Sequence, residues 1–258
     1  MNHFLCYFEF NFLNMRSFIC FDLGETLINF NLKNRWYKSL KNEVIPLMWA
    51  RLKQLTTSKP ENIEFTRFQN VLYKSIAREF TIEKNTSFID RIKIGLSRLN
   101  IDYNEEIKEN LLDSFYKIIR EKSTLFPEVQ EILNYLNRRK YTIGLFSDTP
   151  WQSPGYLMDR LLKHHEIYSL IDFRLYSGDI KIRKPNPRTL LILSEKAKKR
   201  SEDMVYIGDK DVDIEVAFRC KIPSILVNRH KDKRVKLSRK PTYEIDSLLH
   251  LKEIISKL

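Results

Sequence analysis

The sequence has few cysteines and no long apolar run, and both shortages narrow the class of protein. Its three cysteines, Cys6, Cys20 and Cys220, lack C-x-x-C spacing, so neither a disulfide framework nor a zinc knuckle is expected. No uncharged apolar run approaches the roughly 18 residues that cross a bilayer. The first residues carry Glu9 and have neither a basic leader nor a cleavage site. We therefore expect a cytoplasmic protein without a membrane span.

Low-complexity tracts and internal repeats of fixed period are also missing, which is typical of an ordinary folded chain. The 258 residues are 43% hydrophobic and 30% charged, enough for one large domain or two modest ones. The formal net charge is +12, but the densest basic stretch, Arg229 to Lys240, has no interleaved aromatic residue to stack on bases. We therefore do not expect nucleic acid to be the main partner, and no pattern predicts an oligomeric state.

Strand and helix signals alternate over the second half of the chain. Apolar strands are predicted at 141–146, 173–176, 204–207 and 224–227, with helices between them. This alternation predicts a parallel sheet covered by helices on both faces. The apolar stretch that starts at residue 17 and stops at Asp22 is expected to be another strand of that sheet. The predicted fold class is therefore α/β, with a Rossmann-like parallel sheet as its core.

The segment 31–121 has helical spacing and no strand signal. Apolar residues recur at helical intervals in three runs, which are Phe65, Phe68, Leu72 and Ile76; Ile92, Leu96 and Leu99; and Ile107, Leu111, Phe115 and Ile118. This predicts a helical bundle inserted after the first strand, with its regularly spaced aromatic residues in the bundle core. The expected organisation is an N-terminal arm at 1–16, an α/β core at 17–30 and 122–258, and the inserted helical domain at 31–121.

Polar side chains follow three of the predicted strands. Asp22 ends the first strand, Ser147 and Asp148 follow the strand 141–146, and Asp209 follows 204–207 with Asp213 one turn later. Carboxyl ends of parallel strands meet at one edge of a sheet, where helix N-termini also point, so we expect these side chains to converge. Because a lone carboxylate at the end of an apolar strand is costly to bury, a functional role is favoured for Asp22.

A lysine, Lys184 in the stretch KIRKPNP, lies between the second and third of these strands and completes the set. Mg²⁺ takes one or two carboxylates, keeps waters and accepts phosphate oxygens. A lysine and a hydroxyl can hold the remaining phosphate charge. Taken singly, Ser147 is better explained as a helix cap and Lys184 as a surface lysine. Together, the residues favour phosphoryl transfer.

Four motifs carry a family resemblance. They occur in the order FDLGETL, GLFSDT, RKPNP and YIGDKDVDIEVA, within about residues 17–258. The chain resembles the haloacid-dehalogenase superfamily of hydrolases, in the form with a helical cap inserted after the first strand. The resemblance implies a small phosphorylated substrate, Mg²⁺ as the cofactor, and a cap that admits substrate and excludes water.

The resemblance also implies a role for each matching residue. Asp22 would be the nucleophile that becomes an aspartyl-phosphate, and because an aspartate is ionised at neutral pH it needs no activating base. Ser147 and Lys184 would be the other catalytic residues. Substrate would be bound by Thr26, Ser147, Asp148 and Lys184. The metal ligands would be Asp22, Asp209, Asp213 and the backbone carbonyl of Gly24.

The first motif departs from the phosphatase pattern of the superfamily at Gly24. Those phosphatases read D-x-D-G-T, and the second aspartate protonates the leaving alkoxide and then activates water. Loss of a positioned proton donor costs about 10² to 10⁴ in rate. Three compensations are open. Glu25 can serve as the proton donor, although neighbouring side chains of an extended segment point to opposite sides. The leaving group can be one that needs no proton, such as an acyl phosphate, a phenolate or a halide. A residue of the cap can also supply the chemistry.

Three alternatives therefore stand beside a Mg²⁺-dependent phosphatase of a small phosphorylated metabolite. Dehalogenases of the superfamily also replace the second aspartate, but they work without a metal, so Asp209 and Asp213 favour the phosphatase. A phosphonate hydrolase uses a cap lysine, and no spacing singles one out here. A catalytically weakened member would bind phosphate-bearing partners, nucleic acid included, through its basic surface.

Overall fold

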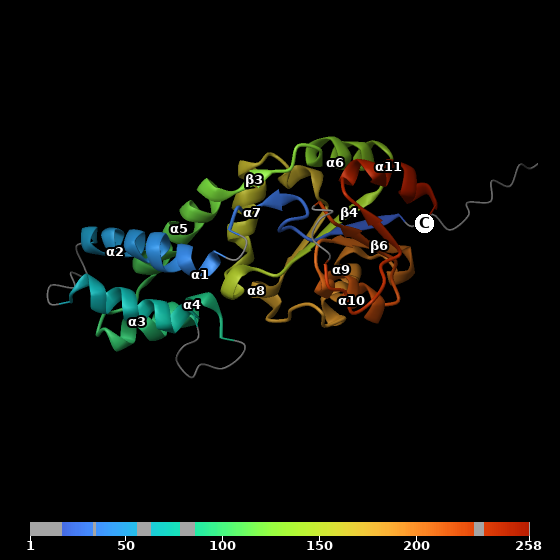
Figure 1. Cartoon of the computed structure of the whole chain (residues 1–258). Coiled ribbons are helices and arrows are strands. Elements are labelled where there is room, and N and C mark those ends of the chain that lie inside the picture. The colour runs from blue at the N-terminus through green and yellow to red at the C-terminus, as the bar shows by residue number, and fades with distance from the viewer. Residues whose placement is uncertain (1–16, 33–34, 56–62, 78–85, 230–234, 258) are drawn as a thin grey trace, which may run out of the picture.

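The computed structural model describes residues 17–32, 35–55, 63–77, 86–229 and 235–257 (Figure 1). The predicted N-terminal arm, residues 1–16, lies outside this part of the chain. Six strands form one sheet in the order β5 (Phe173–Tyr176), β4 (Thr142–Ser147), β1 (Phe18–Phe21), β6 (Met204–Gly208), β7 (Ser224–Val227) and β8 (Tyr243–Ile245). Every neighbouring pair is parallel, which confirms the predicted sheet.

Strand β1 lies in the middle of this sheet and is fully buried. Its side chains alternate between two apolar layers, with Ile19 and Phe21 in one and Phe18 and Cys20 in the other. The first layer includes side chains of α6 (Val129–Arg138), α7 (Gly155–His164) and α11 (Leu251–Ile254). The second includes those of α9 (Arg188–Ala197) and α10 (Asp211–Arg219). Helices thus cover both faces, as expected of a Rossmann-like α/β fold.

The inserted helices stand to one side of the sheet (Figure 1). The chain leaves through β2 (Ile28–Asn29) and returns through β3 (Thr124–Leu125), and these two short strands pair antiparallel. Between them lie α1 (Trp36–Ser39), a π-helical turn (Leu40–Val44), α2 (Ile45–Gln54), α3 (Phe65–Ala77), α4 (Phe88–Arg98) and α5 (Glu105–Lys122). Helical structure is therefore confirmed in the described part of 31–121, whereas its separation as a domain stays a prediction.

Local sequence explains where the inserted helices begin. The side chain of Ser87 accepts a hydrogen bond from the backbone N–H of Asp90 at the start of α4, and that of Asn104 does the same for Ile107 at the start of α5. The predicted core aromatics Phe68 and Phe115 are buried, whereas the prediction was wrong for Phe65, which is 36% exposed at the first position of α3. Among the helices of the described residues, none combines the length and the apolar character needed to span a membrane.

Two shorter helices complete the part of the fold that surrounds the site. The segment after β4 forms a 3₁₀ turn (Pro150–Gln152) before α7, and α8 (Ser177–Ile180) directly follows β5. Strands β2, β3 and β8 are not predicted by the sequence, because runs of two or three residues are too short to show a period.

Candidate functional site

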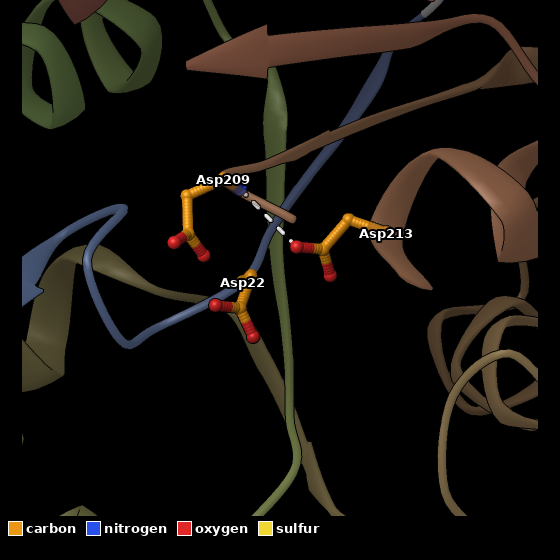
Figure 2. Close-up of side chains that lie close together, drawn as sticks. All are labelled: Asp22, Asp209 and Asp213. Atoms are coloured by element: carbon orange, nitrogen blue, oxygen red, sulfur yellow. Dashed lines mark hydrogen bonds between the residues drawn. The ribbon is translucent and has the colours of Figure 1, made fainter. Parts of the chain in front are cut away.

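Three carboxylates lie together at the carboxyl edge of the sheet (Figure 2). Asp22 follows β1, Asp209 follows β6, and Asp213 comes from the first turn of α10. One oxygen of each lies within 4.8 Å of the others. The neighbouring parallel strands bring them together, because the ladder between β1 and β6 continues to the Asp22 N–H, which donates to the carbonyl of Ile207 at 2.8 Å. The predicted convergence of these residues is therefore present.

Asp213 is fully buried, and both of its oxygens are engaged. Oδ2 accepts hydrogen bonds from the backbone N–H groups of Asp209 at 3.1 Å and Lys210 at 3.0 Å. Oδ1 accepts from Lys184 Nζ at 2.6 Å. The carboxylate lies directly against the end of β6, since a Cβ added to Gly208 would stand 2.3 Å from Asp213 Cγ. Only glycine at position 208 leaves room for this contact.

Lys184 joins two of the carboxylates. Its Nζ donates to Asp22 Oδ1 at 2.6 Å, to Asp213 Oδ1 at 2.6 Å and to Tyr206 Oη at 3.2 Å, and its side chain is 3% exposed. Burial alone would lower the pKa of Lys184, but the charges of Asp213 and Asp22 outweigh it and raise that pKa well above its usual value. The ammonium therefore stays charged and fixes the orientation of Asp22.

Two other carboxyl groups at this edge are buried without full pairing. Among the described residues, Asp209 Oδ1 and Asp148 Oδ1 have no hydrogen-bond partner, although Asp209 Oδ1 forms an ion pair with Lys210 Nζ at 3.3 Å. Burial raises the pKa of Asp209 to about 7, and it also raises the pKa of Asp148. Such groups are costly to bury unless a ligand completes their interactions, so their oxygens suit a bound cation.

A cavity of about 670 Å³ opens over this edge, a size usual for small-molecule sites. Its charged and polar lining is Asp22, Glu25, Ser147, Asp148, Arg183, Lys184 and Lys210. Its aromatic and apolar lining is Phe30, Trp36, Tyr37, Pro150, Trp151, Met158 and Val212. Hereafter we call the first set, together with Asp213 and Asp209 that contact its Lys184 and Lys210, the charged floor, and the second set the aromatic wall.

The structure does not bring Thr26 to the cavity. The residue is fully buried and is not among the lining residues. Its carbonyl accepts a hydrogen bond from Arg229 Nη2 at 2.9 Å, and its hydroxyl has no hydrogen-bond partner among the described residues. Substrate binding by Thr26 stays a prediction, whereas Ser147, Asp148 and Lys184 do line the cavity.

The segment after Asp22 is not extended, and this changes the position of Glu25. Glu25 has a φ of 62°, in the left-handed region, and its N–H donates to the carbonyl of Ile28 at 2.7 Å. The side-chain alternation expected of an extended segment therefore does not hold here. Glu25 and Asp22 line the same cavity. The ring of Phe30 packs against Gly24, where an added Cβ would stand 3.1 Å from Phe30 Cε2.

Several residues of the site are not predicted from the sequence. Tyr206 lies inside β6, where it resembles any core aromatic, and it supports Lys184 while donating to the carbonyl of Phe146 at 3.2 Å. Lys210 stands inside the fourth motif between two singled-out aspartates, a signal that could have identified it. Trp151 follows the second motif by two residues, and a large aromatic side chain in that loop was a comparable signal.

A parallel sheet with aspartates and a lysine at its carboxyl edge, and helices inserted after its first strand, has a Rossmann-like α/β architecture with a charged site at the strand ends. The sequence model of the haloacid dehalogenase-like hydrolases matches residues 19–227, and the chain belongs to this family. Phosphoglycolate phosphatase from Salmonella choleraesuis is 30% identical over 122 residues, and that from Escherichia coli is 29% identical over 122. Each match covers 46% of this chain and 46% of the relative, so the aligned region is less than half of either protein.

Solved structures share the fold over nearly the whole chain. A 2-haloacid dehalogenase from Pseudomonas syringae has a TM-score of 0.63 at 19% identity, covering 94% of this chain and 99% of that one. A HAD phosphatase from Thermococcus onnurineus has a TM-score of 0.60 at 18% identity, covering 93% and 97%. A HAD hydrolase from Bacillus subtilis bound to magnesium has a TM-score of 0.57 at 14% identity, covering 93% and 98%.

Proposed function

We propose that the chain is a Mg²⁺-dependent phosphatase that hydrolyses a small phosphorylated metabolite by way of an aspartyl-phosphate on Asp22. The observation that carries the proposal is the contact of one buried ammonium, Lys184, with Asp22 inside a group of three carboxylates. The partial match to phosphoglycolate phosphatases supports phosphate-ester chemistry. The inserted helices serve as the cap, since Trp36 and Tyr37 of α1 reach the cavity.

The donor set fits Mg²⁺, which prefers hard oxygen ligands and keeps some of its waters. Asp22 and Asp209 would hold the ion together with the carbonyl of Gly24. Asp213 acts instead as a positioning residue, because its oxygens already accept from Lys184 and from two backbone N–H groups. When bound, the ion draws negative charge from the transferring phosphoryl group and aligns it with Asp22.

In the first step, an oxygen of Asp22 attacks phosphorus, and the bond from phosphorus to the ester oxygen breaks. Lys184 keeps the attacking carboxylate oriented and balances the charge that develops around it. The hydroxyl of Ser147, at the end of β4, donates to a phosphoryl oxygen. In the second step, water attacks phosphorus, which releases inorganic phosphate and regenerates the Asp22 carboxylate.

Glu25 supplies the proton for the leaving alkoxide and accepts one from the attacking water. Its left-handed backbone and its place in the cavity lining support this assignment. A non-glycine residue in this region is uncommon, and such strain is concentrated at functional sites. Glu25→Gln should lower turnover of alkyl phosphates by about 10² or more. In a single turnover, the release of a phenolate should be much less affected, because a phenolate needs no proton. Equal losses for both ester types in this first step would contradict the role of Glu25 as proton donor.

The alternatives find less support. The lysines that line the cavity, Lys184 and Lys210, belong to the α/β core. Among the described residues, no lysine of the inserted segment lines the cavity, so none is placed to form the Schiff base of a phosphonate hydrolase. A dehalogenase shares the fold at 19% identity, and at that identity the likeness supports a common architecture and not a common reaction. The group of three carboxylates favours a metal-dependent reaction over dehalogenation.

The test is phosphate release from p-nitrophenyl phosphate and acetyl phosphate, with Mg²⁺ and with a chelator. We expect metal-dependent turnover that falls by about 10⁴ or more in Asp22→Asn. Asp102→Asn, at an exposed position of the inserted segment, is the matched control and should retain activity. Turnover that survives in Asp22→Asn would overturn the proposal. So would an inactive wild type whose binding to DNA or RNA weakens with salt.

A further inference from the structure

The rings of the aromatic wall form one continuous row and come from three segments of the chain. The ring centroids of Phe30 and Trp36 are 5.5 Å apart, those of Trp36 and Trp151 are 6.1 Å apart, and those of Tyr37 and Trp151 are 5.7 Å apart. Phe30 follows β2, Trp36 and Tyr37 belong to α1, and Trp151 belongs to the turn after β4. Tyr37 is 55% exposed, so part of its ring is free to contact a ligand.

Trp151 is held in place from behind. Its ring stacks on Phe88 of α4, with centroids 6.3 Å apart and an interplanar angle of 26°, and it also meets the edge of Phe115 at 6.0 Å. The backbone is left-handed at Trp151, with a φ of 49°, and at Gln152, with a φ of 56°. Two consecutive non-glycine residues in that region are costly, so the surrounding contacts must stabilise them.

Buried hydrogen bonds provide that support. Thr149 Oγ1 donates to the carbonyl of Ser153 at 2.8 Å, and the Thr149 N–H donates to Ser177 Oγ at 3.0 Å. The Gly155 N–H donates to Asp179 Oδ1 at 2.8 Å. The turn that carries Trp151 is thereby fastened to α8, and the indole ring faces the cavity in a fixed orientation.

The cations of the charged floor are already paired, so little positive charge is available to bind a second anionic group of a substrate. Each lining cation is paired with a carboxylate: Lys184 with Asp22 and Asp213, Lys210 with Asp209 at 3.3 Å, and Arg183 with Asp148 at 3.8 Å. The part of a substrate beyond its phosphate therefore meets the rings, Pro150 and Met158 rather than an unpaired cation of the lining. A short ester with a second anionic group and no ring, such as 2-phosphoglycolate, would gain nothing from this wall.

We infer that the preferred substrates are phosphate monoesters whose alcohol part carries a planar aromatic ring, packed against Trp36, Tyr37 and Trp151. The inference rests on the proposed function for the phosphate half of the substrate and extends it to the other half. Aromatic rings prefer offset or edge-to-face contact with other rings, and each such pair adds to simple apolar burial. A fixed wall keeps the entropic cost of that contact low.

The experiment compares benzyl phosphate with cyclohexylmethyl phosphate. Both esters have nearly the same size and both release an alkoxide, so a difference in kcat/KM reports contact with the ring and not the ease of leaving. We expect about a 10-fold preference for the benzyl ester, the sum of two or three ring contacts. A third arm with 2-phosphoglycolate should give the lowest kcat/KM. A fourth with adenosine 5′-monophosphate distinguishes a nucleobase from a simple arene as the ring.

Substitutions test whether the aromatic wall causes the preference for benzyl phosphate. Tyr37→Leu should reduce the benzyl preference by about 2- to 5-fold, mainly through a higher KM for benzyl phosphate. Phe218→Leu is the matched control, because Phe218 is 53% exposed, close to the exposure of Tyr37, and is not among the lining residues. The control should keep the full preference. A preference that Tyr37→Leu does not alter would overturn the placement of the ring.

Binding of benzylphosphonate, which is not hydrolysed, separates this inference from the proposed function. Quenching of tryptophan fluorescence by benzylphosphonate, at concentrations where cyclohexylmethylphosphonate causes none, would support the aromatic subsite even if no phosphate ester were turned over. Equal kcat/KM values for the two esters, with normal metal-dependent phosphate release, would overturn the inference and leave the proposed function intact.

Discussion

The charged floor and the aromatic wall of one cavity are built in different ways. Asp22, Ser147 and Asp209 each stand at the end of a strand, so the hydrogen bonds of the sheet fix where they lie. Trp36 and Trp151 come from a helix of the inserted segment and from a 3₁₀ turn, and only side-chain packing brings them together. The polar residues at the strand ends are therefore tied to the sheet, while the aromatic wall is built from segments that can vary without disturbing the sheet.

The strongest test of this comparison replaces Lys184, one of the cations of the charged floor. Lys184→Met leaves Asp22 and Asp213 buried near one another without their shared partner, which should lower the free energy of unfolding by about 3–5 kcal/mol. Phosphatase activity should fall by about 10² to 10³. Urea unfolding and phosphate release measure the two effects. Lys240→Met, at an exposed lysine, is the control, and a Lys184 variant as stable as the control would contradict the structural role.

Metal binding should stabilise the floor and leave the wall unchanged. Mg²⁺ at 100 times its dissociation constant should raise the free energy of unfolding by about 2.7 kcal/mol, seen as a higher melting temperature. Asp209→Asn should abolish that response. In the absence of metal the same variant should be slightly more stable than the wild type, because one of three crowded carboxylates is gone. A Mg²⁺ response that persists in the variant would place the ion elsewhere.

Substitution of two glycines by alanine compares how easily the floor and the wall make room for an added methyl group. Gly208→Ala would put a Cβ 2.3 Å from Asp213 Cγ, so we expect a loss of about 1–3 kcal/mol in stability together with a loss of activity. Gly24→Ala meets only the ring of Phe30, at 3.1 Å, and a side chain can shift slightly. Its cost should stay below about 1 kcal/mol. Comparable costs for both variants would show that the wall is as rigid as the floor.

The sequence predicts the floor well and the wall poorly, for a physical reason. Asp22, Ser147 and Asp209 follow apolar strands, and the rule that parallel strands end at one edge places them together without coordinates. Strands 173–176 and 224–227 were predicted at the bounds the structure shows. The extended conformation expected at Glu25 was wrong, because a left-handed residue after Gly24 breaks the alternation of an extended chain. Trp36 gave no signal at all, since its contact with Trp151 spans 115 positions and depends on tertiary packing.

A modest effect on stability is expected at the loop that joins floor and wall. Arg229 forms an ion pair with Glu128 and also donates to the carbonyl of Thr26 at 2.9 Å, so it fastens the turn between Asp22 and β2. Burial alone would raise the pKa of Glu128, but its hydrogen bond with Arg229 outweighs this and lowers that pKa below its usual value. Because the folded-state pKa is lowered, the contribution of this pair to stability is present above the unfolded pKa and is lost as the pH falls through the folded one.

Glu128→Gln should therefore cost about 1–2 kcal/mol of stability near neutral pH, and this difference from the wild type should shrink as the medium is acidified below the ordinary glutamate range. Urea titrations at a series of pH values measure it. Glu131→Gln, at a more exposed glutamate one turn along α6, is the control and should show little change at any pH. A cost for Glu128→Gln that stays constant into acid would mean that packing, and not the charge of Glu128, holds the turn that connects Asp22 to the inserted helices.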